Sequence, residues 1–210
     1  MTSTTILLTA SLGLALGTNL FAADVVRFEG QPTGSKVRME GDSTIHKWHA
    51  ESTVVSGFME FDKGFALDAL KAGPVTTKVE AVIPVRTLKS SSGRPMDNVM
   101  YSAMSVTNFN KIEFRLNSLE CKDPKAPAKF EAKGNLVVMG ATNPITMAIT
   151  IEAPQKDQLL VKTTDKLKMK MSDYKIKAPV LNLGIMKIVT DDNVEISVEW
   201  LTGLKAPDAK

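Results

Sequence analysis

The chain has 210 residues, of which 43% are hydrophobic and 23% are charged, and its formal net charge is +3. These values are ordinary for a soluble globular protein, and the length suits one domain with a sizeable core. Clustered arginines with interleaved aromatic residues, the pattern of a nucleic-acid-binding groove, are not present, so we expect no nucleic-acid partner.

The first 23 residues are similar to a secretory signal peptide. An apolar stretch from Ile6 to Gly17 is followed by the small residues Ala22 and Ala23, and it is too short and too broken for a membrane span. No lysine or arginine precedes it, so a buried N-terminal helix is the alternative interpretation. We expect residues 1–23 to be a signal peptide and residues 24–210 to be one periplasmic or secreted domain.

Cys121 is the only cysteine. An exported protein with one cysteine has no intramolecular disulfide, and there is no cysteine near residue 20 to carry a lipid anchor. We therefore expect a mature protein without stable membrane insertion. A homodimer is compatible with the sequence.

From residue 36 onward, segments alternate apolar and polar residues at the period of a β-strand. Strand side chains point alternately to two faces, so each segment has one apolar and one polar face. Turn residues separate many of the segments, as at Gly41-Asp42 and Asp191-Asp192-Asn193. About eight strands are predicted, from alternating or extended segments over residues 36–40, 44–53, 54–61, 75–85, 111–116, 130–139, 145–151, 159–171 and 194–204.

The two closing segments show this alternation most clearly. Leu159, Val161, Leu167, Met169 and Met171 share one parity in the first segment, and Val194, Ile196, Val198 and Trp200 share one in the second. Such a series of strands indicates an antiparallel sheet closed or stacked around an apolar interior. The functional question is whether side chains fill that interior or leave room for a ligand.

Two segments are predicted to be helical. Ala66–Ala72 reads as a short helix that ends at Gly73-Pro74. Pro95–Met104 has a proline suited to the first turn, with Asp97 as a helix-start residue. Its apolar stripe comprises Met96, Val99, Met100 and Met104.

His46 and His49 are the only histidines. Three residues apart on a strand, they face opposite sides and cannot share a metal, so no metal site is predicted. His46 has the parity of Trp48. It is either a core histidine beside a packed tryptophan or a polar contact near one end of a cavity.

No catalytic constellation is visible. The chain has no Gly-x-Ser-x-Gly turn and no phosphate-binding loop, and Ser90-Ser91-Ser92 have turn composition. We expect a protein that is not an enzyme and needs no cofactor. The 11 methionines fit plain core packing, and methionine also suits a wall that adapts to a mobile apolar ligand.

Six segments, taken together, carry a resemblance to a known family. They are GDSTIHKWHAES from Gly41, VIPVRTLKSSSGRPMDNVMYSAM from Val82, FNKIEFRL from Phe109, GNLVVMGATNPITMAI from Gly134, LKMKMSDYKI from Leu167 and VEISVEWL from Val194. In order and spacing they resemble the YceI-like family of exported polyisoprenoid-binding proteins. The chain departs from that family at Phe109-Asn110, where many relatives carry Tyr-Pro, and at Ser91-Ser92-Gly93, where histidine and acidic residues are common.

The resemblance implies an all-β fold with a minor helical part. The expected architecture is an eight-stranded antiparallel lipocalin-like β-barrel with one or two short helices, around a pocket for a quinone, a polyprenyl lipid or another long lipid. Eight strands can enclose one small ligand, which agrees with the strand count. The alternative is a filled β-barrel that acts as an exported surface or partner-binding protein without a lipid.

Under the lipid-binding hypothesis, strand parity and the helix stripe predict the residues that contact the ligand. The expected ligand-binding residues are His46, Trp48, Ile83, Val85, Met100, Ile112, Phe114, Met169 and Met171. No catalytic or metal-binding residue is predicted.

We expect the mature protein to begin near Asp24 and to be found outside the cytoplasm, because the Ile6–Ala23 segment has the character of a cleaved export signal. N-terminal sequencing of the exported fraction tests this. An intact chain beginning at Met1 and confined to the cytosol would contradict it.

Overall fold

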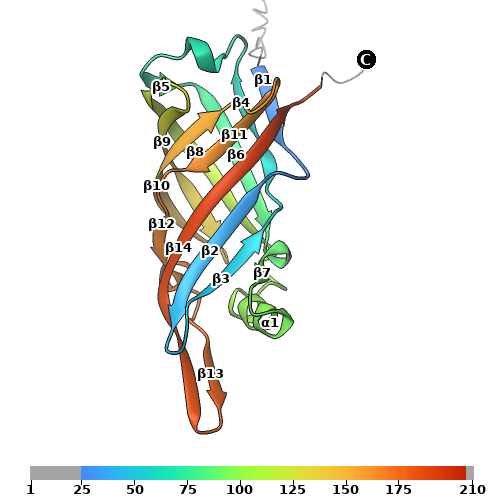
Figure 1. Ribbon diagram of the computed structural model, residues 1–210, viewed down its shortest axis with the longest axis vertical. Coiled ribbons are helices and arrows are strands. Elements are labelled where there is room, and N and C mark those ends of the chain that lie inside the picture. The colour runs from blue at the N-terminus through green and yellow to red at the C-terminus, as the bar shows by residue number, and fades with distance from the viewer. Residues whose placement is uncertain (1–24, 207–210) are drawn as a thin grey trace, which may run out of the picture.

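The computed structural model describes residues 25–206, which form an elongated barrel with a hairpin projecting from one end (Figure 1). The expected signal peptide lies outside the described residues. The strands are β1 (Val25–Gly30), β2 (Lys36–Ser43), β3 (Trp48–Ser52), β4 (Ser56–Asp62), β5 (Gly73–Val75), β6 (Thr77–Pro84), β7 (Lys89–Ser90), β8 (Lys111–Asp123), β9 (Ala128–Val138), β10 (Ala141–Glu152), β11 (Gln158–Thr163), β12 (Leu167–Lys170), β13 (Val180–Leu183) and β14 (Met186–Leu204). The α-helix is α1 (Arg94–Ala103), and the short 3-10 helices are η1 (Leu67–Ala69), η2 (Val85–Thr87) and η3 (Met171–Tyr174).

Within residues 25–206, eight antiparallel strands close into a barrel. The circuit runs β1-β4-β6-β8-β9-β10-β11-β14, and β14 pairs back with β1 through registers such as Phe28 with Leu204. The predicted fold class, an eight-stranded antiparallel barrel with a minor helical part, is therefore confirmed. No helix in this part of the chain is long and apolar enough to span a membrane.

Different strands form the barrel wall at different levels along its length. At the β1 end, β14 pairs with β11 and β1, and nearer its middle it pairs with β12 and β2. The wall then continues from β2 to β3 and to the two-residue strand β7. Beside β3 and β7 lies α1 (Figure 1), so a helix completes the wall where the strands end.

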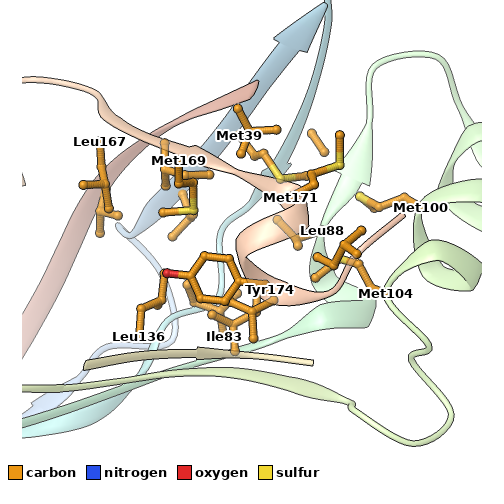
Figure 2. A pocket seen from close by; sticks show the side chains of 18 of the residues that line it. Met39, Ile83, Leu88, Met100, Met104, Leu136, Leu167, Met169, Met171 and Tyr174 are labelled. Atoms are coloured by element: carbon orange, nitrogen blue, oxygen red, sulfur yellow. The ribbon is translucent and has the colours of Figure 1, made fainter. Parts of the chain in front are cut away.

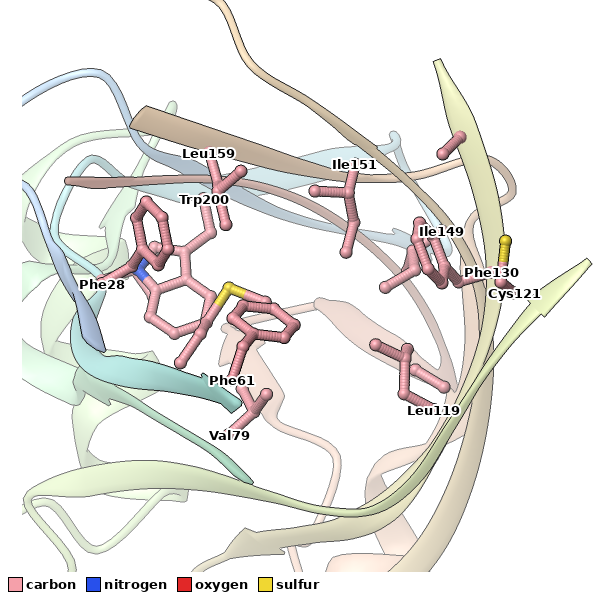
Figure 3. Close-up of a cluster of buried hydrophobic side chains, with 14 of the residues drawn as sticks. Phe28, Phe61, Val79, Leu119, Cys121, Phe130, Ile149, Ile151, Leu159 and Trp200 are labelled. Atoms are coloured by element: carbon pink, nitrogen blue, oxygen red, sulfur yellow. The ribbon is translucent and has the colours of Figure 1, made fainter. Parts of the chain in front are cut away.

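A cluster of buried side chains fills the β1 end of the barrel (Figure 3). Phe61 is 1% exposed, stacks on Phe65 with ring centroids 3.8 Å apart, and meets the edge of Phe28 at 6.2 Å. Trp200, Phe130 and Ile151 belong to the same cluster. These large side chains pack the interior here as a conventional core.

The outer face of the barrel carries ion pairs within strands and between neighbouring strands. Arg27 contacts Glu60, Lys133 contacts Glu131, and Glu40 lies against both Lys166 and Arg38. The two cations hold the pKa of Glu40 at about 2, with the Lys166 hydrogen bond as the largest cause. The lysines that alternate along the strands thus form a solvated, largely paired surface.

Some expected elements differ from the observed ones. Ala66–Ala72 contains only the 3-10 turn η1, because Leu67 and Leu70 pack onto the core cluster and Gly73–Val75 then pairs with β8. The predicted strand 159–171 is divided into β11 and β12, where the Thr164 amide leaves the β14 ladder and donates to Ala148. The helix predicted over Pro95–Met104 is α1, shifted by one residue.

Replacing Phe61 with alanine removes the centre of the aromatic cluster. We expect Phe61→Ala to lower the free energy of unfolding by about 3–5 kcal/mol, because a fully buried ring leaves a cavity that cannot collapse. Phe58→Ala is the matched control, since Phe58 lies on the other face of β4, half-buried under the Arg27 guanidinium. We expect that variant to lose about 1 kcal/mol. Urea unfolding measures both, and equal losses would contradict this packing.

Candidate ligand cavity

An apolar cavity of about 270 Å³ occupies the barrel interior between the core cluster and the α1 end (Figure 2). Its floor includes Met59, Val79 and Trp200, which are also members of the core cluster. The polar residues among those that line it are Ser43, His46, Ser90, Ser92, Thr163, Lys170, Tyr174 and Thr190. The interior is therefore filled at one end and hollow at the other.

Alternate residues of the barrel strands form the cavity wall. On β6 these are Val79, Ala81 and Ile83, on β8 Ile112, Phe114 and Leu116, and on β14 Val194, Ile196, Val198 and Trp200. The intervening residues point outward and make the ion pairs of the surface. The period-two pattern of the sequence thus becomes one continuous apolar lining.

Helix α1 supplies the part of the wall that strands do not. Its cavity-facing residues are Met96, Val99, Met100, Ala103 and Met104, which include the predicted stripe. Its polar side is anchored to the preceding segment: the Ser90 amide donates to the Asp97 carboxylate at 2.6 Å, and the Tyr101 hydroxyl donates to the Leu88 carbonyl at 2.7 Å. Asp97 is in the first turn, as expected, and also holds the helix in place.

Methionines dominate the adaptable part of the lining. Of the ten methionines in residues 25–206, eight line the cavity, and in Figure 2 several of them gather around one space from β2, α1, β12 and η3. They are Met39, Met59, Met96, Met100, Met104, Met147, Met169 and Met171. Unbranched, polarizable thioethers rearrange at low cost, so this wall can adjust to the shape of a flexible chain.

The structure brings together eight of the nine residues predicted to contact a ligand. His46, Trp48, Ile83, Met100, Ile112, Phe114, Met169 and Met171 all line the cavity. Val85 does not: it is 1% exposed and packs in a second core cluster with Met104 and Val106. The strand ends at Pro84 and η2 begins at Val85, so the parity of β6 does not extend to it.

Polar side chains gather at the α1 end of the cavity. His46 lies in the turn between β2 and β3, and its Nδ1 is 2.9 Å from the Lys47 carbonyl oxygen. A carbonyl only accepts hydrogen bonds, so this contact places a proton on Nδ1 and leaves Nε2 for another partner. His49 is absent from the lining and pairs with Glu40 across the strands, as expected for the opposite face.

The prediction that Gly41 lies in a turn is wrong. Gly41 is a β2 residue and pairs with Trp48 of β3. A Cβ atom there would lie 2.3 Å from Cζ2 of Trp48, so only glycine leaves room for the indole. The indole Nε1 donates to the Asp42 carbonyl at 3.1 Å, which fixes the ring at the edge of the cavity.

Tyr174 is a lining residue that sequence reasoning missed. It is 3% exposed, and burial raises the pKa of its phenol against the opposing effect of a hydrogen bond with Asn143. It reaches the interior because η3 turns the chain inward directly after β12. Among residues 25–206, no group of three or more His, Cys, Asp or Glu side chains could hold a metal ion.

The barrel and its cavity define a lipocalin-like protein with an apolar internal cavity. A model of the YceI-like domain matches residues 28–200, and the chain therefore belongs to the YceI-like family. The resemblance found in the sequence is confirmed. A search of curated proteins finds no match.

Solved structures share this fold at low identity. A polyisoprenoid binding domain from Saccharophagus degradans has a TM-score of 0.62 at 13% identity, over 85% of this chain and 98% of that one. BcnA of Burkholderia cenocepacia has a TM-score of 0.57 at 16% identity, over 80% and 95%. The Campylobacter jejuni YCEI protein has a TM-score of 0.54 at 17% identity, over 75% and 85%.

The Asp97 contact gives a test of how α1 is held. We expect Asp97→Ala to lower the free energy of unfolding by about 1–3 kcal/mol, because the Ser90 amide loses its acceptor. Hydrogen exchange at Ser90 and along α1 should accelerate. Asp97→Asn keeps an acceptor oxygen and is the control that should restore most of the protection. Unchanged exchange in Asp97→Ala would show that the Asp97 hydrogen bond does not hold the helix.

Proposed function

We propose that this protein is an exported binding protein that holds a long-chain isoprenoid, such as a quinone or polyprenyl lipid, or a similar lipid in its barrel cavity. The observation that carries the proposal is the hollow, methionine-rich half of the barrel. Membership of the YceI-like family supports it, as does the similarity to a polyisoprenoid binding domain.

The energetics of an apolar lining favour such a ligand. Each CH₂ group removed from water contributes about 0.8 kcal/mol, so a prenyl chain binds through area and needs few polar contacts. Phe114, Ile112 and Met169 line the cavity from β8 and β12. Since empty apolar volume lowers stability, a bound chain would also stabilise the barrel.

The polar residues at the α1 end fit the head group of such a lipid. His46, Ser90 and Ser92 line the cavity there. With a proton on Nδ1, neutral His46 offers Nε2 as an acceptor to a hydroxyl, and protonated His46 offers Nε2 as a donor to a carbonyl or phosphate oxygen. We propose that the head group lies among these residues, with the chain directed toward the aromatic floor.

Export and a binding role complete the proposal. The signal-like residues 1–23 support a periplasmic or secreted location. Binding by apolar area stabilises a ground state and a transition state alike, so it gives no rate enhancement. We therefore propose a carrier or reservoir rather than an enzyme, working without a cofactor.

An acidic side chain in the lining should prevent lipid binding. We expect Phe114→Asp to abolish retention of bound lipid, because an apolar chain cannot solvate a buried carboxylate. Phe109→Asp is the matched control, because Phe109 is 38% exposed and does not line the cavity. Organic extraction and mass spectrometry of the purified variants give the result. Folded Phe114→Asp protein that keeps its lipid would contradict the proposal.

The binding role is tested by following the ligand itself. We expect lipid to be recovered chemically unchanged after long incubation, and His46→Ala to change affinity without removing any turnover. Chromatography of extracted lipid before and after incubation is the measurement. Reproducible conversion of a prenyl substrate that disappears in folded His46→Ala would show an enzyme instead.

A further inference from the structure

A two-stranded hairpin projects beyond the α1 end of the barrel, opposite the end where the described chain begins and finishes (Figure 1). β13 pairs with the first residues of β14, from Val180 with Val189 to Leu183 with Met186. Gly184 has φ 66°, which suits the tight turn at the tip. The hairpin is held to the barrel at its base, where the Thr44 amide donates to the Val189 carbonyl at 3.0 Å.

The hairpin is apolar and open to solvent. At its tip Ile185 is fully exposed and Met186 is 50% exposed, and at its base Val180 and Val189 are 45% and 37% exposed. Apolar residues concentrated on a projecting element mark a surface that contacts a partner or a membrane. Charged side chains, by contrast, cover the outer faces of the barrel strands.

This apolar surface is continuous with the cavity. Leu181 and Ile188 are paired across the hairpin, and both line the cavity. Ile45, in the neighbouring turn, also lines it and is 51% exposed. A path of apolar side chains therefore leads from the tip into the barrel.

The hairpin and the segment leading into it carry only basic charges, whereas Asp173, Asp191 and Asp192 lie just outside them. Residues 174–190 contain Lys175, Lys177 and Lys187 and no acidic residue, and Lys47 lies in the turn beside the hairpin base. All four lysines are exposed and make no ion pair within the described part of the chain. Lysines of the barrel wall such as Lys133 and Lys162 do pair with glutamates. Unpaired lysines on and beside an apolar hairpin complement an anionic lipid surface.

We propose that this hairpin docks the protein on an anionic lipid bilayer. Ile185 and Met186 enter the boundary between head groups and acyl chains, and the lysines contact lipid phosphates. Docking brings the α1 end of the cavity to the bilayer, so a lipid chain passes between membrane and barrel without crossing water. The passage of a lipid chain between bilayer and cavity rests on the proposed function, whereas docking of the protein on the bilayer is measured separately.

Vesicle sedimentation tests the apolar tip. The protein is mixed with vesicles of phosphatidylcholine containing a quarter phosphatidylglycerol, or with phosphatidylcholine alone. We expect binding to the anionic vesicles, and a loss of at least about tenfold in the partition coefficient of Ile185→Asp. Leu204→Asp is the matched control, since Leu204 is 41% exposed at the opposite end and should leave binding unchanged.

A charge reversal tests the lysines. We expect Lys187→Glu to weaken binding to the anionic vesicles by about fivefold or more, and high salt to weaken the wild type. Lys71→Glu is the control, because Lys71 is exposed at the far end of the barrel. Both hairpin substitutions lie on the surface, and equal urea midpoints would show that folding is intact.

Docking would be overturned if the wild type did not bind anionic vesicles, or if Ile185→Asp and Leu204→Asp bound them equally. It would also be overturned if sedimentation equilibrium showed that the hairpin instead forms a dimer. Hairpin-dependent vesicle binding by protein that retains no lipid in mass spectrometry would support docking while removing the proposed carrier function. If Ile185→Asp retains its lipid but takes up a labelled prenyl lipid from vesicles more slowly, the result would support both membrane docking and the carrier function.

Discussion

The structure depends on the backbone hydrogen bonding of β14. Along its 19 residues this strand pairs with β13, then with β12 and β2, and finally with β11 and β1. A barrel has no free sheet edges only if one strand closes the circuit. In this chain the same strand closes the circuit, supplies Val194, Ile196 and Val198 to the cavity, and extends beyond the barrel as half of the hairpin. Closure, lining and hairpin are consequences of one continuous strand.

Side-chain size then decides where the interior is solid and where it is hollow. The β1 end contains Phe28, Phe61 and Trp200, which fill a barrel of eight strands. Toward α1 the wall carries methionines and small residues such as Ala50 and Ala103, and the helix replaces strands on one side. Unfilled apolar volume lowers the stability of a folded protein, so larger side chains in this half would make the barrel more stable when no ligand is bound. A hollow half beside a well-packed half supports the proposed binding role.

Period-two alternation made the strands and most of the lining predictable, and the resemblance to the YceI-like family implied the closed barrel. The parity of Ile83, Ile112 and Phe114 followed directly from the sequence, as did the α1 stripe. Alternation does not report where a strand stops, which is why Val85 was placed on the wall although η2 begins there. Positions set by tertiary packing were also missed, such as Gly41 under the Trp48 ring and Tyr174 after η3. The hairpin has apolar residues on both faces, as in Val180 and Leu181, so it lacked the polar alternation of the other strands.

The central claim is that the hollow half of the barrel takes up an apolar chain. Methyl NMR of protein labelled at the methionine methyl groups tests it most directly, because eight methionines line the cavity while Met139 packs outside it and Met186 lies on the hairpin. On titration with a short prenyl alcohol, the account predicts shifts or slow-exchange doublets for the lining methionines, with Met139 little affected. Unchanged signals from the lining methionines, or shifts confined to Met186, would contradict it.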